Sequence, residues 1–268
     1  MSQITILLLY LLAAAAFIMS RLPRFESRSR PLFVVACILA ATGIVVHVQS
    51  LSHLMMPRHG FDLSVGKAVA TIGLELAAIG LIAAIEPRLR GMSGGLIFLA
   101  ALTILLMGPT GDAAAGVAMT WQVRAHILIA LLSYGLLTVG TIVALFALVQ
   151  ERRLRAAKLS PVNQLFAPLE TTEKLLFTIA AAGFAGLTLA IASGTSFVNN
   201  LMEQHLAHKF GLSLLAWLIF GILVAGRFFR GWRGKRAIHL YLGGFAVLCL
   251  AYFGSRLILE EVFHRSWG

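Results

Sequence analysis

Histidine gives this chain most of its possible chemistry, because imidazole is the commonest metal ligand among side chains. The chain has eight histidines. His47 lies inside a long apolar stretch, while His126 and His264 stand at the ends of two others. His205 and His208 are three residues apart, which would place both imidazoles on one face of a helix. These five residues are the candidate ligands.

The two histidines closest to apolar stretches also have structural interpretations. His47 could donate a hydrogen bond to the backbone of a neighbouring helix, and His126 could anchor a helix end at a membrane surface beside Trp121 and Arg124. An ionisable group within a membrane span costs free energy that a partner must offset. We therefore favour the functional interpretation for both histidines.

Glu75 is the other costly residue, because it lies in the middle of an apolar run. A transporter would use such a carboxyl group as a proton relay, whereas a structural protein would use it, protonated, in an interhelical hydrogen bond. The sequence leaves both interpretations open. It contains no Gly-rich phosphate loop, paired-carboxylate site or nucleophile elbow.

Composition indicates the elements that must position these residues. The chain is 59% hydrophobic and 12% charged, with a mean hydropathy of +0.89, which is typical of an α-helical integral membrane protein. The stretch from Trp121 to Arg155 predicts one long helix, without a charged residue between His126 and Gln150. We expect an all-α polytopic membrane protein, a bundle of about eight transmembrane helices in a single domain over residues 1–268. The expected spans are roughly 3–20, 31–52, 66–86, 93–108, 124–150, 173–194, 209–229 and 236–259.

Basic residues predict the topology. Most of the 22 lysines and arginines follow spans one, three, five and seven, so the positive-inside rule places those loops in the cytoplasm and both termini outside, on the periplasmic side. The fourth span is short and could penetrate only halfway, but the charge pattern favours a full crossing. The first span has its basic cluster after it, so we expect a retained helix and no signal peptide. All histidines except His239 then lie toward the outer side. The net charge of +11 follows from topology, so the expected partner is the lipid bilayer and no nucleic acid.

Four sequence blocks resemble one known family. His126–Gly135 (HILIALLSYG) resembles the opening of the histidine helix in CcsA-type cytochrome c assembly proteins. The segments GFAGLTLAIASG (183–194), AWLIF with GWRGKR (216–236), and AYFG through His264 are similar to that family's later helices, in the same order. The resemblance covers most of the chain, best from Gln122 onward. It points to the short YpjD/HemX-like branch.

The resemblance implies a cofactor, haem b, held at the periplasmic surface. The two outer histidines that hold haem iron in the family correspond to His126 and His264. An intramembrane histidine of the family matches His47, but its usual partner falls near Ala225, which cannot bind iron. The family's tryptophan-rich signature should lie between Gly194 and Lys209, where this chain has no tryptophan. His205 or His208 could replace it as ligands.

The missing signature argues against a complete haem–cytochrome ligase, so we expect no enzyme. The resemblance implies a haem-binding protein of the bacterial inner membrane, acting in cytochrome c assembly or haem handling. Its partners would be other cytochrome c maturation or haem-biosynthesis proteins. Two alternatives stay open: a regulatory or scaffolding membrane protein of haem biosynthesis, and a transporter of a small solute or metal that uses Glu75 and His47.

Overall fold

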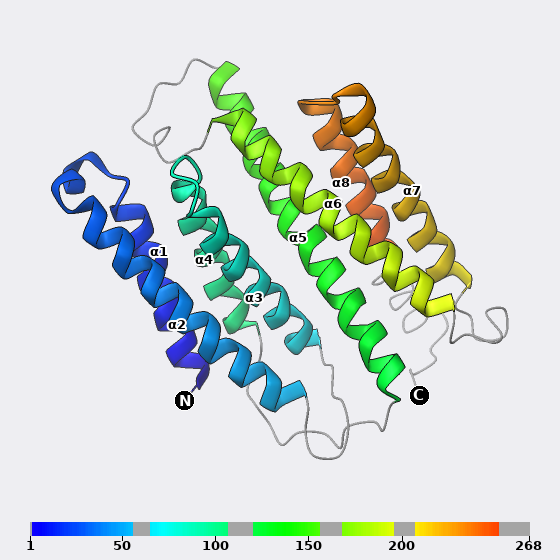
Figure 1. Ribbon diagram of the computed structural model, residues 1–268, viewed down its shortest axis with the longest axis horizontal. Coiled ribbons are helices and arrows are strands. Elements are labelled where there is room, and N and C mark those ends of the chain that lie inside the picture. The colour runs from blue at the N-terminus through cyan, green and yellow to red at the C-terminus, as the bar shows by residue number, and fades with distance from the viewer. Residues whose placement is uncertain (1, 56–64, 107–119, 156–167, 196–206, 252–268) are drawn as a thin grey trace. The chain divides into compact units, whose positions relative to one another are not determined.

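The described part of the chain is entirely helical. The computed structural model describes residues 2–55, 65–106, 120–155, 168–195 and 207–251, which contain eight α-helices, one 3₁₀ helix and no strand (Figure 1). The helices are α1 (Ser2–Met19), η1 (Pro23–Arg28), α2 (Ser29–Met55), α3 (Val65–Ala83), α4 (Arg90–Leu105), α5 (Trp121–Arg155), α6 (Leu169–Thr195), α7 (Ala207–Arg230) and α8 (Lys235–Cys249).

Each of the eight expected spans coincides with one α-helix, which confirms the all-α polytopic membrane class. Within the described ranges, five segments are long and apolar enough to cross a bilayer: Pro23–His53, Gly66–Ala83, Trp121–Arg153, Leu169–Thr195 and Phe210–Arg230. α1 and α4 are shorter apolar helices. With 16 residues, α4 is about 24 Å long, less than a hydrocarbon core of about 30 Å. The sidedness of the termini stays a prediction.

The long helix expected at the centre of the chain is present as α5, which contains the expected span of 124–150 and begins at Trp121 and ends at Arg155. Its 35 residues span about 52 Å, so both ends extend beyond a hydrocarbon core. Arg124 is exposed at one end and Arg152 at the other, while Val143, Ala144 and Ala147 between them are buried.

The chain divides into two compact units, and each is described by itself. Unit 1 comprises Met1–Arg124 and Val149–Thr172, and unit 2 comprises Ala125–Leu148 and Glu173–Gly268. The expectation of one membrane domain therefore stays a prediction.

Unit 1 is built on helix pairs that approach closely at glycines. α1 packs on α2 and α4, and α3 packs on α4 and α2. A Cβ on Gly43 of α2 would lie 2.7 Å from the Tyr10 ring of α1, and one on Gly94 of α4 would lie 3.3 Å from the carbonyl oxygen of Ala14 in α1. Small residues at helix contacts are the usual basis of packing in membranes, where the hydrophobic effect does not separate helix from lipid.

Unit 2 adds polar contacts between helices. Ser133 of α5 donates a hydrogen bond to the carbonyl of Gly183 in α6 at 2.8 Å. Tyr241 of α8, fully buried, donates to the carbonyl of Leu137 in α5, also at 2.8 Å. A Cβ on Gly140 would meet the same tyrosine ring, 2.7 Å from its Cζ atom. The absence of a side chain at position 140 therefore lets α8 lie against α5.

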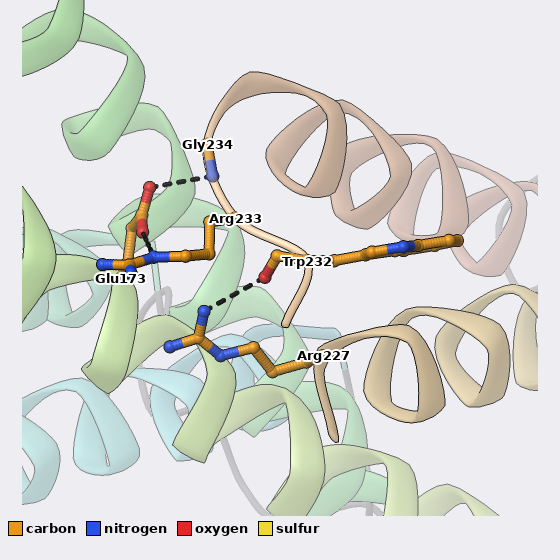
Figure 2. Close-up of polar contacts among 5 residues, drawn as sticks. All are labelled: Glu173, Arg227, Trp232, Arg233 and Gly234. Carbon is orange, nitrogen blue, oxygen red and sulfur yellow. Dashed lines mark hydrogen bonds and ion pairs between the residues drawn. The ribbon is translucent and has the colours of Figure 1, made fainter. Parts of the chain in front are cut away.

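The turn between α7 and α8 is held by side chains from two helices (Figure 2). Gly231 and Gly234 have φ angles of +64° and +70°, the left-handed region that favours glycine. Arg227 donates to the carbonyl of Trp232 at 3.1 Å. The buried Glu173 of α6 accepts a hydrogen bond of 2.9 Å from the backbone N–H of Gly234, which precedes the first residue of α8. A carboxylate at a helix N-terminus also interacts favourably with the helix dipole.

We expect Gly140→Val to destabilise the protein, because the new side chain must displace the Tyr241 ring and break its bond to Leu137. Overpacking of this kind costs about 1–3 kcal/mol. Thermal unfolding in detergent, followed by tryptophan fluorescence, measures the change. Gly243→Val is the matched control, since a Cβ at Gly243 meets nothing within 4 Å. Equal melting temperatures for the two variants would contradict the contact.

Candidate functional site

His126 is held by a serine from the neighbouring helix. Its Nδ1 atom lies 2.9 Å from the hydroxyl oxygen of Ser193 in α6. The same hydroxyl lies 2.8 Å from the carbonyl oxygen of Leu189 and 3.1 Å from that of Ala190. A serine hydroxyl has a single proton, which is directed here to its own helix, so its oxygen is left to accept. We infer that His126 Nδ1 carries the proton and donates it to Ser193.

This hydrogen bond decides what His126 can do chemically. A neutral imidazole protonated at Nδ1 has its lone pair at Nε2, where it can bind a metal. Histidines that bind metals almost always donate their other ring N–H to a fixed acceptor, which sets the tautomer and the orientation of the ring. The side chain of His126 is half-buried, so its ring is both supported and accessible.

Gly194 makes room for the His126 ring. A Cβ at this position would lie 3.1 Å from Cε1 and 3.7 Å from Nε2 of His126. Any side chain at 194 would therefore press on the edge of the ring that includes the free nitrogen. Ser193 thus binds the imidazole at Nδ1, and Gly194 leaves room for the edge of the ring that carries Cε1 and Nε2.

His47 has a different environment in unit 1. It is fully buried in α2, and its Nδ1 atom lies 3.1 Å from the hydroxyl of Tyr10, itself fully buried in α1. The two rings meet edge to face with centroids 5.8 Å apart. The backbone partner considered for His47 is thus replaced by a phenol. Its Nε2 atom is buried and has no hydrogen-bond partner among the described residues.

The state of His47 depends on Tyr10. Among the described residues the Tyr10 hydroxyl has no other hydrogen-bond partner, so its proton is best placed toward His47 Nδ1. The ring proton then lies on Nε2, which makes that atom a buried donor without an acceptor. An unmade hydrogen bond of this kind costs about 1–3 kcal/mol, and few such groups persist in native proteins.

Glu75 is buried in α3, as expected for the middle of that span. It is 8% exposed, and neither carboxyl oxygen has a hydrogen-bond partner in the described part of the chain. The interhelical hydrogen bond considered for it is therefore absent from those residues. A buried carboxylate without a partner is far costlier than a carboxylic acid, so the neutral form is favoured.

Glu75 lies at about the depth of Tyr10 and His47 within unit 1. α4 runs antiparallel to α1 and α3 (Figure 1). Gly94 of α4 contacts α1 about two turns beyond Tyr10. About two turns after Gly94, α4 contacts Gly73 of α3, which lies two residues before Glu75. Unit 1 thus places the unsatisfied polar atoms of His47 and Glu75 in one layer.

Three of the five candidate ligands cannot be placed in a site. His205 and His264 lie outside the described residues, and His208 is the second residue of α7. The pairing of His126 with His264 stays a prediction. Over the described ranges, no group of three or more histidine, cysteine, aspartate or glutamate side chains is arranged to hold a metal ion.

The family follows from the match of the whole sequence. Residues 2–263 match the family described as cytochrome C assembly protein. The chain belongs to this family. Its resemblance to CcsA-type proteins and to the YpjD branch is also confirmed by curated relatives.

Relatives of three kinds share about half of the chain. The inner membrane protein YpjD of Escherichia coli K12 is 34% identical over 137 residues, which cover 51% of this chain and 52% of that protein. An uncharacterized 28.8 kDa protein of Azospirillum brasilense is 28% identical over 137 residues, 50% and 51% of the two chains. The cytochrome c biogenesis protein CcsA of Chlamydomonas reinhardtii is 26% identical over 145 residues, 53% of this chain and 39% of that protein. The matches thus span about half the length of these relatives or less. No solved structure matches the chain.

The sequence did not predict Tyr10 or Ser193 as site residues. Both had a usable signal, because each places a hydroxyl within an apolar run, where a polar group needs a partner. The partner itself could not be read from the sequence, since it depends on which faces of the helices meet.

Ser193→Ala should allow His126 to exchange between its two neutral tautomers, because Nδ1 loses its acceptor. In ¹⁵N-histidine-labelled protein, the two ring nitrogens of His126 have well-separated shifts when the proton stays on Nδ1, and converge when it exchanges between them. His126→Gln assigns the signal. Ser52→Ala is the control, since that exposed hydroxyl bonds only within its own helix, to Gln49 at 2.8 Å. Unchanged His126 shifts in the Ser193 variant would contradict the role of Ser193.

Proposed function

We propose that this protein binds haem b in the bacterial inner membrane and handles haem during cytochrome c assembly, with His126 as an axial ligand. The observation that supports it is the bond from His126 Nδ1 to Ser193, which leaves Nε2 free to bind iron in a fixed orientation. The family match supports the process, and the words "inner membrane" in the name of the Escherichia coli relative support the location.

The second ligand in this proposal is His264. Both histidines fall on the outer, periplasmic side in the expected topology, and the resemblance assigns the pair to them. Two imidazoles would fill both axial positions of haem iron, an arrangement suited to carriage and electron transfer but not to oxygen chemistry. His205 and His208 are reserve ligands, in the segment that replaces the tryptophan-rich signature.

His47 is the third possible haem ligand, as the resemblance suggests. For His47 Nε2 to bind iron, the ring proton would have to move to Nδ1 and be donated to Tyr10. The Tyr10 proton would then need another acceptor, and the described residues offer none within hydrogen-bonding distance. His126 therefore has the stronger claim, because its acceptor is already in place.

Purified protein should show the absorption bands of bis-histidine haem in its oxidised and reduced spectra. We expect a His126→Ala, His264→Ala double variant to lose these bands, because both axial nitrogens are removed. His239→Ala is the control: its exposed ring bonds only to the carbonyl of Lys235 in its own helix, at 2.7 Å, so the spectrum should not change.

A colourless parent protein that cannot be loaded with haem would overturn the proposal. The regulatory or scaffolding function would then be favoured, and co-purification with a haem-biosynthesis or cytochrome c maturation protein would support it.

Transport is a second candidate, favoured by the carboxyl group of Glu75, which has no hydrogen-bond partner among the described residues and lies in the layer of His47. Protein reconstituted in proteoliposomes would then carry protons, measured with an enclosed pH-sensitive dye. Glu75→Gln should abolish the flux, because the amide cannot release a proton. Glu86→Gln, at an exposed position just beyond the end of α3, should not. Equal flux in parent, variants and empty vesicles would rule this function out.

A further inference from the structure

The turn that joins α7 to α8 carries an unusual density of positive charge. Residues 227–236 contain five cations and no acid: Arg227, Arg230, Arg233, Lys235 and Arg236. The positive-inside rule accounts for the side of the membrane on which such residues gather. It does not account for how this turn is built.

The turn has a defined conformation, and one cation is used to maintain it (Figure 2). Arg227 donates to the carbonyl of Trp232 and places its guanidinium group 4.6 Å from the centroid of the Phe177 ring. The Trp232 ring in turn occupies the space where Gly226 has no side chain, so that a Cβ there would lie 2.5 Å from its Cδ2 atom. Glu173 fixes Gly234 from α6. The backbone of the turn is therefore held from α6 and α7.

Three arginines of the turn have exposed side chains. Arg230 and Arg236 are exposed and have no ion pair or hydrogen bond to side chains among the described residues. Arg233 keeps 58% of its side chain exposed, although it forms a long ion pair with Glu173, 3.8 Å between Nε and Oε2. Like-charged groups gathered on a fixed turn repel one another, so an anion that binds all three is favoured.

Two aromatic side chains stand beside these arginines. Phe228 and Phe229, the residues directly before Arg230, are 84% and 82% exposed, and their rings meet edge to face at 5.5 Å. They lie in the last turn of the membrane-crossing segment Phe210–Arg230, so they reach the edge of the hydrocarbon core. An apolar pair just inside the membrane and three cations just outside it match the two parts of a phospholipid.

We propose that the turn between α7 and α8 is a binding site for an anionic phospholipid. The phosphate groups of the lipid bind Arg230, Arg233 and Arg236, and an acyl chain packs on Phe228 and Phe229. Arginine suits this task because its planar guanidinium group can donate two parallel hydrogen bonds to a phosphate. The site is independent of the haem site proposed for His126.

The turn between α1 and α2 is an internal comparison. It also has three exposed arginines, Arg24, Arg28 and Arg30, but Glu26 lies among them and its aromatic residue Phe25 is half-buried. Diffuse attraction between basic loops and an anionic surface would treat the two turns alike. A built site would distinguish them.

The test uses delipidated full-length protein in detergent, titrated with phosphatidylglycerol and followed by native mass spectrometry. Each basic residue near an anionic group contributes about fivefold to binding, so R230Q/R233Q/R236Q should weaken it by about a hundredfold. The matched triple variant R24Q/R28Q/R30Q should change it by less than about threefold. Thermal unfolding checks that each variant is folded. If the first triple variant fails to fold, R230Q/R236Q replaces it, since the described residues provide no partner for these two arginines.

Further probes separate the lipid from its phosphate. F228A/F229A should weaken the binding of phosphatidylglycerol. The same substitutions should leave the binding of inorganic phosphate unchanged, both in the parent protein and in the R230Q/R233Q/R236Q variant. Phosphatidylcholine, which has no net charge, should bind far more weakly to the parent protein. Equal loss in the two triple variants would overturn the proposal and leave only diffuse attraction. Full displacement of the lipid by millimolar inorganic phosphate would overturn it as well.

Discussion

In the hydrocarbon core of a membrane each polar group must find its partner inside the protein, and the described structure follows from this constraint. Helices satisfy the backbone, which is why apolar runs become helices rather than single strands. Hydroxyl groups are then satisfied locally: Thr138, Thr141 and Thr188 each donate to the carbonyl four residues earlier. Once these bonds are formed, few polar atoms are left open. Among the described residues, His47 Nε2 and the two Glu75 carboxyl oxygens are buried without a partner inside apolar spans, and they are therefore informative.

The same constraint prepares His126 for its proposed role. The hydroxyl proton of Ser193 is used within α6, so the serine reaches the neighbouring helix as an acceptor only. Ser193 donates its proton within α6 and thereby fixes the tautomer of His126 in α5. Gly194 is the steric part of the arrangement, because the ring can approach α6 only where no side chain stands. Position and protonation of the imidazole thus have one structural cause, the contact of α5 with α6.

The sequence predicted the helices well and their contacts poorly, for a physical reason. The length of an apolar run sets the length of a membrane span, so the span of 124–150 within α5 could be predicted. A helix that is apolar on all sides gives no signal for which face meets its neighbour. The bonds from Tyr10 to His47, from His126 to Ser193 and from Gly234 to Glu173 depend on helix rotation and register. The sequence therefore identified the polar residues whose burial costs free energy, but it did not identify their partners.

His47 and His126 differ in how their protons are held, and this difference argues for a division of tasks. His126 donates from Nδ1 to the hydroxyl oxygen of Ser193, which can only accept, so Nε2 keeps its lone pair. His47 faces a phenol that can donate or accept, and whose proton has no other acceptor among the described residues. Binding of iron by His47 would exchange one unmade hydrogen bond for another, because the N–H at Nε2 lacks an acceptor in the present state and the Tyr10 proton would lack one afterwards. His126 needs no such exchange, because Ser193 already accepts from its Nδ1 atom. This difference favours His126 as the proposed iron ligand and a hydrogen-bonding role for His47, in the layer of Glu75.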